Sequence, residues 1–121
     1  YLIAAEASAK LNDKAAAAKY LNAIVQRANP KATPVSEADA TVDRILVERR
    51  KELVGEGHRF FDAMRNNQTI VRYTDEAKKG YHYTLTTPES RKFDRTYFRI
   101  VLPIPRGETN VNRKIQQNPG Y

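Results

Sequence analysis

Two glutamates and a histidine stand close together in the segment VERRKELVGEGHRFF (Val47–Phe61). Carboxylate and imidazole groups carry out general acid–base catalysis or bind metal ions in many proteins. Here Glu52, Glu56 and His58 are separated by a glycine-containing break, so they do not share one helical face as the ligands of a His-Glu-x-x-His motif do. His82 lies far along the chain, and the sequence has no cysteine and no Gly-rich phosphate loop. We therefore expect no catalytic residues, no metal site and no cofactor.

A second group of chemical interest is the tyrosine pair in YHYTLT (residues 81–86). Alternate residues of a strand face the same side, so Tyr81 and Tyr83 would form one aromatic surface. Such a surface can stack on the apolar face of a sugar ring, which makes both residues weak candidates for ligand binding. The alternative is that the same surface packs on neighbouring helices, and the residues alone leave both interpretations open.

The composition is that of one folded domain. The chain has 121 residues, enough for a single hydrophobic core, and the absence of cysteine excludes disulfides and thiolate metal sites. The net charge of +7 comes mostly from residues 67–121, which hold 10 basic and 5 acidic side chains, against 11 and 9 in residues 1–66. These basic residues form no Lys/Arg block, so we expect ordinary solubilising charge and no nucleic-acid partner.

The start of the chain has no targeting features. No apolar run approaches the roughly 20 residues that a membrane helix needs, and no signal peptide is recognisable. The chain opens on YLIAAEASAK, without an initiator methionine, and this stretch is typical of the middle of a helix. We expect the chain to be part of a longer protein, with any membrane attachment outside it.

Helical periodicity dominates residues 1–66. Apolar residues recur at spacings of three and four, which predicts an antiparallel helix pair within residues 1–28, a third helix over 42–56 and a short fourth helix from residue 58 to about 65. Gly55 and Gly57 should weaken the third helix where it ends.

The pattern changes after residue 68. TIVRYT, YHYTLT and TYFRIVLPIP are rich in β-branched and aromatic residues and predict short strands or extended segments joined by polar loops. The remaining C-terminal residues have proline and glycine at turn positions, so we expect an irregular segment with at most one short turn of helix.

The charges of the third helix raise a structural question, because Arg49 falls on its apolar stripe. Glu52 and Glu56 would repel each other if left alone on a helix. Arg49 and Arg59 bracket them at spacings of three. We expect a charged network at the edge of the core, in which guanidinium groups satisfy carboxylates and fix how helices dock.

The same segment resembles the signature of the SusD/RagB family, which reads I-x-x-E-R-x-x-E-L-x-x-E-G-x-R-x-x-D-L-x-R. The residues that fill this pattern are Ile45, Glu48, Arg49, Glu52, Leu53, Glu56, Gly57, Arg59, Asp62 and Arg65. Ala63 stands where the family usually has leucine. In that family the signature is mainly a fold element, which agrees with a structural network of Glu48, Arg49, Glu52, Glu56, Arg59 and Asp62.

Both ends of the chain extend the resemblance. YLIAAEASAKLNDKAAAAKYLNAIVQRA is similar to the helix pair that precedes the signature. The C-terminus is similar to the family pattern P-I-P-x-x-E-x-x-x-N-x-x-x-x-Q-N-P-G-Y. The residues that fill it are Pro103, Ile104, Pro105, Glu108, Asn112, Gln117, Asn118, Pro119, Gly120 and Tyr121. The resemblance therefore covers nearly the whole chain.

The resemblance implies a mainly α fold with tetratricopeptide-like helix pairs and an irregular, short-strand C-terminal segment. The chain would be the C-terminal part of a single SusD/RagB-like domain, helical over 1–66 and irregular with short strands over 67–121. Members of the family are outer-membrane lipoproteins on the surface of Bacteroidetes-type cells. They capture glycans, or in some cases peptides, without catalysis and deliver them to a SusC-like TonB-dependent transporter. Their lipid anchor would lie outside this chain.

The helix pair within residues 1–28 allows another interpretation. It is also typical of helical-repeat modules that bind protein partners, although a single copy does not establish a repeat. The glycan or peptide bound by the protein is not encoded in any motif of the chain.

Overall fold

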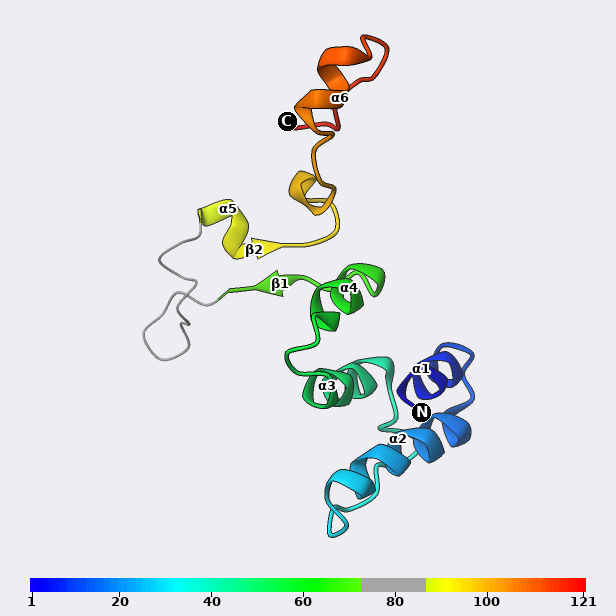
Figure 1. Cartoon of the computed structure of the whole chain (residues 1–121). Helices are drawn as coiled ribbons and strands as arrows, with labels where there is room; N and C mark the ends of the chain where they lie inside the picture. Colours follow the sequence, from blue (N-terminus) through cyan, green and yellow to red (C-terminus); the bar gives the residue numbers. More distant parts are fainter. Residues whose placement is uncertain (73–86) are drawn as a thin grey trace. The chain divides into compact units, whose positions relative to one another are not determined.

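The computed structural model describes residues 1–72 and 87–121, and its contacts divide the chain into two compact units, Tyr1–Asp62 and Ala63–Tyr121 (Figure 1). The fold is mainly helical with one short two-stranded sheet, which confirms the predicted class. The predicted YHYTLT strand lies outside the described residues, and so do Tyr81 and Tyr83.

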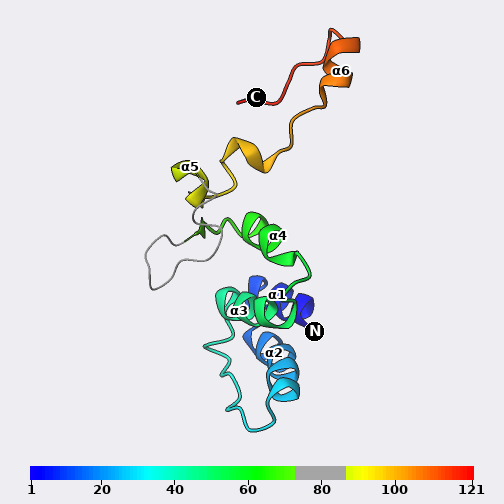
Figure 2. The same ribbon diagram turned by 60° about the vertical axis from the view of Figure 1, so that its left-hand side comes forward.

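The first unit is built from three packed helices and the start of a fourth. These are α1 (Leu2–Lys10), α2 (Lys14–Ala28), α3 (Val42–Glu52) and α4 (His58–Arg65). Helices α1 and α2 form an antiparallel pair, and α3 lies beside them (Figures 1 and 2). The four helices predicted within residues 1–66 are therefore confirmed.

The core of this unit lies where α1, α2 and α3 meet. Ala5 and Ala17 are fully buried, and their small side chains let α1 and α2 approach closely. Leu21 and Ile45 are the largest fully buried side chains. Burying a side chain of this size stabilises a fold by roughly 1.5–3 kcal/mol, so the hydrophobic stripes are the main source of stability here.

Side-chain hydrogen bonds position the ends of these helices. Asp13 accepts a hydrogen bond from the Ala16 amide at 3.0 Å and so caps the start of α2. In the connection from α2 to α3, the Asn22 amide group bonds both backbone groups of Val35, at 2.7 and 2.9 Å. This clamp holds an irregular segment against α2.

Helix α3 ends at Glu52, whereas the sequence predicted that it would extend to residue 56. Gly55 and Gly57 have φ angles of 83° and 76°, a backbone conformation that favours glycine and stops the helix. Glu56 consequently lies in a turn, where its amide donates to the Leu53 carbonyl at 3.2 Å. The predicted helical repulsion between Glu52 and Glu56 does not arise.

The second unit contains only short elements in its described part. They are β1 (Ile70–Val71), α5 (Pro88–Arg91), β2 (Lys92–Phe93), η2 (Phe98–Ile100) and α6 (Arg106–Val111). Strands β1 and β2 are antiparallel, with Ile70 opposite Phe93 and Val71 opposite Lys92. The strand in TIVRYT was predicted, whereas α5 and β2 were not.

The prediction of a strand or extended segment is wrong for the first part of TYFRIVLPIP, where the structure has a turn and a 3₁₀ helix. Asp94 Oδ1 accepts hydrogen bonds from the Thr96 amide at 2.8 Å and hydroxyl at 2.7 Å. The Tyr97 amide donates to the Asp94 carbonyl at 3.1 Å and closes the turn. The Ile100 amide then donates to the Tyr97 carbonyl at 3.0 Å, which starts η2.

Residues 101–104 are extended but are held by side chains of the C-terminus. Gln117 accepts from the Ile104 amide at 2.7 Å and donates to the Ile104 carbonyl at 2.9 Å. The side chains of Asn118 and Tyr121 donate to two further carbonyls of this segment, at 2.7 and 2.9 Å. We call Gln117, Asn118 and Tyr121 the C-terminal clasp. It supplies the hydrogen bonds that a neighbouring strand would otherwise make.

Gly120 allows the clasp to close. Its φ of 92° favours glycine, and an added Cβ would lie 2.6 Å from the Phe98 ring. The same ring meets Tyr121 edge-to-face at a centroid distance of 5.3 Å. A side chain at position 120 would therefore displace an aromatic contact as well as strain the backbone.

We expect Gly120→Ala to destabilise the second unit by about 1–3 kcal/mol, because strain at positive φ and overpacking act together. Gly107→Ala is the matched control: it lies in α6 with open space around it, so alanine should be neutral or slightly stabilising. Urea unfolding followed by tyrosine fluorescence measures both. Equal midpoints for the two variants would contradict the close contact at Gly120.

Candidate functional site

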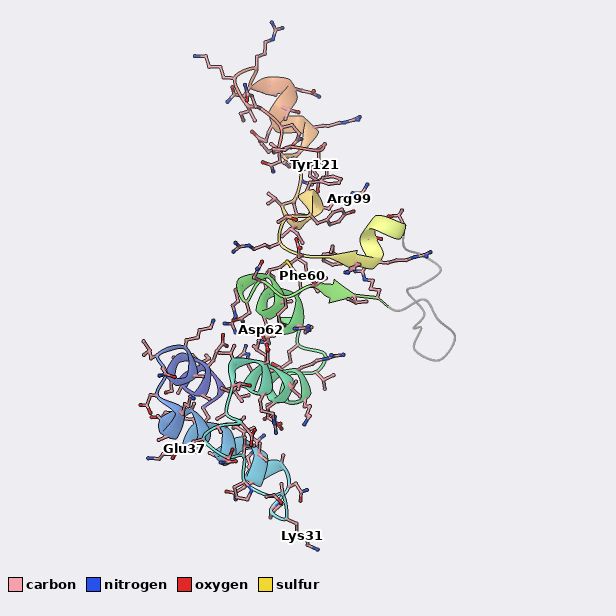
Figure 3. All side chains as sticks on the ribbon, turned by 180° about the vertical axis from the view of Figure 1, so that it is seen from behind. Lys31, Glu37, Phe60, Asp62, Arg99 and Tyr121 are labelled. Atoms are coloured by element: carbon pink, nitrogen blue, oxygen red, sulfur yellow. The ribbon has the colours of Figure 1, made fainter. Side chains whose placement is uncertain are left out.

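The signature segment contains a buried ion pair that joins α3 to α4. Arg49 Nε lies 2.9 Å from Asp62 Oδ2, and the two side chains are 10% and 9% exposed. Asp62 is labelled in Figure 3. The burial of Arg49 agrees with its predicted place on the apolar stripe. Among the described residues, no buried side-chain nitrogen or oxygen lacks a hydrogen-bond partner. The charge of Arg49 is thus compensated inside the fold.

Glu48 is the second buried charge of this segment. Its Oε2 accepts from Arg44 Nη1 at 2.8 Å and from Lys51 Nζ at 3.3 Å, both on α3. Burial acts to raise the pKa of Glu48, but the hydrogen bonds and charges of Arg44 and Lys51 outweigh it and leave the pKa below its ordinary value. Glu48 is therefore a fixed anion at neutral pH.

The other charged residues of the signature have partners that the sequence did not predict. Glu52 pairs with Arg27 at the end of α2, so it links α2 to α3. Glu56 Oε2 lies 3.8 Å from His58 Nε2, at the surface. Arg49 bonds Asp62 across the glycine turn, and not the two glutamates that it was expected to bracket. These contacts link carboxylates of the signature to cations on the same helix and on neighbouring helices.

A cavity of about 450 Å³ lies beside these pairs within the first unit. Its lining residues are Leu46, Arg49, Arg50, Leu53, Val54, Gly55, Gly57, His58, Arg59, Phe60 and Asp62. The walls combine apolar side chains with basic groups, and the one carboxylate, Asp62, is engaged by Arg49. In the part of the chain that the structure describes, no group of three or more His, Cys, Asp or Glu side chains is arranged to hold a metal ion.

This arrangement does not supply an acid–base pair of the usual kind. Glu56 and His58 come together, but their side chains are 58% and 49% exposed. Such exposure leaves both groups in contact with water, whereas a general acid usually needs a pKa raised by burial. The geometry of the signature is that of a helix-docking element.

One buried charge was missed by the sequence analysis. Glu6 on α1 is 4% exposed, and its Oε1 accepts from Lys10 Nζ at 2.9 Å. Glu6 lies four residues after Leu2, on the same side of the helix, and this spacing could have predicted that it is buried. The C-terminal clasp was also missed as an interaction, although its residues were recognised as a pattern.

None of the helices in the described part of the chain has the length and apolar character needed to cross a membrane.

The described residues form a mainly helical fold that contains the signature, and comparison with known proteins identifies the family. The SusD family model matches residues 1–121, the whole chain. The chain belongs to the SusD family, which is a family of non-catalytic binding proteins, typically lipoproteins of the cell surface. Comparison with curated proteins gives no significant match.

Solved structures agree with this assignment. A SusD superfamily protein of Bacteroides vulgatus is 49% identical and superimposes with a TM-score of 0.83 over 100% of this chain and 26% of its own. A second B. vulgatus protein, to which sugar binding has been ascribed, is 43% identical, with a TM-score of 0.81 over 100% of this chain and 27% of its own. A SusD superfamily protein of Bacteroides thetaiotaomicron is 43% identical, with a TM-score of 0.82 over 98% and 26%. The chain spans about a quarter of the length of these structures.

We expect Arg49→Ala to lower the free energy of unfolding by about 3–5 kcal/mol, because it removes the guanidinium that compensates the buried Asp62 carboxylate. Arg50→Ala is the matched control: this neighbouring arginine is exposed, and its loss should cost about 0–0.5 kcal/mol. Urea unfolding of the purified protein measures both changes. An Arg49→Ala midpoint equal to that of Arg50→Ala would show that the pair does not stabilise the fold.

The free energy of unfolding should depend on pH through the ionisation of Glu48. Because its pKa is lower in the folded protein, its stabilising contribution is present above about pH 4.5 and is lost as the pH falls through the folded value. Glu48→Gln should lower the free energy of unfolding by about 1 kcal/mol at pH 7, and the difference should disappear at acid pH, once Glu48 is protonated in the folded protein. Glu37→Gln, an exposed position labelled in Figure 3, is the control and should change stability at neither pH. A deficit for Glu48→Gln that stays constant with pH would contradict this role.

Proposed function

We propose that the protein containing this chain captures glycans, or in some cases peptides, at the outer-membrane surface and delivers them to a SusC-like TonB-dependent transporter. In this proposal the protein is a lipoprotein whose lipid anchor lies outside the chain. The chain itself is the C-terminal part of a single SusD/RagB-like domain. The observation that carries the proposal is the match of the SusD family model to residues 1–121.

One further observation supports glycans as the ligand class, and another supports binding without catalysis. A relative with 43% identity over the whole chain is a protein to which sugar binding has been ascribed. In addition, Glu48, Arg49, Glu52 and Asp62 of the signature are engaged in ion pairs that hold helices, so these groups serve the fold. Capture without turnover is consistent with both.

Tyr81 and Tyr83 remain our candidates for ligand contact within this chain. The proposal for them comes from their alternation in a predicted strand, which puts both rings on one side, and from the ability of aromatic rings to stack on sugars. His82, between them, would face the opposite side.

We expect the full-length protein to bind members of a glycan panel in calorimetric titrations and to release no reducing ends from any of them. Tyr81→Ala and Tyr83→Ala should each weaken binding by about 5- to 100-fold, since stacking of one ring is worth about 1–3 kcal/mol where it has been measured on aromatic side chains. His82→Ala is the matched control and should leave the affinity unchanged. Hydrolysis by the protein would overturn the capture proposal. Unchanged binding in both tyrosine variants would show that Tyr81 and Tyr83 do not contact the ligand, and the capture proposal would still stand.

A further inference from the structure

The second unit contains a hollow of about 240 Å³ between the Asp94 turn and the C-terminal clasp. It is smaller than the roughly 300–1,000 Å³ of pockets that take drug-sized ligands, so it suits a single small ring. Its lining includes Arg95, Thr96, Tyr97, Val101, Asn118 and Pro119. These residues are outside the signature, and the proposed function assigns no role to them.

Arg95 supplies hydrogen-bond donors to this hollow. In the described part of the chain, no hydrogen bond or ion pair engages its guanidinium, and the residue is exposed. The adjacent acid, Asp94, is already engaged: its Oδ1 accepts both Thr96 hydrogen bonds, and these, helped by the charge of Arg95, lower its pKa. An exposed guanidinium that makes no hydrogen bond within the described residues is suited to bind a carboxylate, to which it can donate two parallel hydrogen bonds.

The hollow also offers acceptors for hydroxyl groups. Asn118 uses its Nδ2 to donate to the Leu102 carbonyl, and its Oδ1 has no partner among the described residues. The Thr96 hydroxyl donates to Asp94, so its oxygen lone pairs can still accept. The clasp fixes Asn118 in place, which reduces the entropy that a ligand must remove on binding.

Apolar groups complete the lining. Tyr97 is half-buried, and its ring lies 5.7 and 5.2 Å from those of Phe93 and Phe98, so the aromatic side chain is held by its neighbours. Val101 and Pro119 add apolar surface on other sides. A held aromatic ring beside polar groups is suited to a sugar ring, which has apolar C–H faces and a rim of hydroxyls.

We propose that this hollow binds one pyranose ring of an anionic saccharide, with the uronate carboxylate on Arg95 and ring hydroxyls on Asn118 and Thr96. The inference rests on the proposed function and adds a ligand class to it. Long-range charge favours the same ligand, because residues 67–121 carry 10 basic and 5 acidic side chains.

The test compares two ligands that differ only in charge. The full-length protein is titrated calorimetrically with a galacturonic-acid oligosaccharide and with its carboxyl-reduced, neutral form of equal length and linkage. We expect the wild type to bind the charged form about tenfold more tightly, and Arg95→Gln to lose most of this preference. Arg99→Gln is the matched control, because Arg99 lies 5.3 Å over the Phe98 ring, is not in the hollow and carries the same charge. It should retain the preference.

The outcomes separate this inference from the proposed function. A wild type that binds both ligands equally, or an Arg95→Gln variant that keeps the full preference, overturns the anionic subsite while glycan capture still stands. Equal losses in Arg95→Gln and Arg99→Gln would show a general charge effect and would also overturn the subsite. Failure to bind either ligand overturns it as well, whereas the capture proposal fails only if nothing in the wider glycan panel binds. Thermal melts should show unchanged folding in both variants, since neither arginine is buried.

Discussion

The buried pair of Arg49 and Asp62 is the constraint on which the signature segment depends. A guanidinium placed among apolar side chains is costly unless a carboxylate meets it, and here that carboxylate comes from the next helix. The requirement fixes α4 against α3 after a turn in which Gly55 and Gly57 both take positive φ. The charges on this segment thus serve specificity of docking more than net stability.

The other carboxylates of this segment are also compensated by nearby cations. Glu48 is held by two cations of its own helix, and Glu52 is held by Arg27 from α2. Opposite charges lower the pKa of a carboxyl group, as they do for Glu48, and this is the reverse of the shift that a general acid requires. A family of non-catalytic binding proteins can therefore contain a segment this rich in acids and bases, because the groups act on one another.

Sequence and structure agree where local rules decide the outcome. The helices of residues 1–66 were predictable because each carries its own apolar stripe, which needs only the neighbouring turns to be recognised. The partners of Arg49 and Glu52 were not predictable from spacing, since Asp62 and Arg27 lie on other helices. The prediction of a strand or extended segment was wrong in the first part of TYFRIVLPIP for a similar reason. Asp94 organises a turn there, and side chains of the C-terminal clasp, more than ten residues away, take the hydrogen bonds of residues 101–104.

The two units are stabilised differently, and this difference bears on where ligands are bound. Among the described residues, every buried apolar side chain lies in the first unit except that of Ala63, the first residue of the second unit. The described part of the second unit relies instead on ring contacts such as Phe98–Tyr121 and on side-chain bonds to backbone carbonyls. A segment held in this way leaves polar atoms and aromatic surfaces unburied, and irregular segments are where binding residues concentrate in proteins. Both sets of proposed ligand contacts, the tyrosines of YHYTLT and the hollow at Arg95, fall in this unit, whereas the buried pairs of the signature fall in the other.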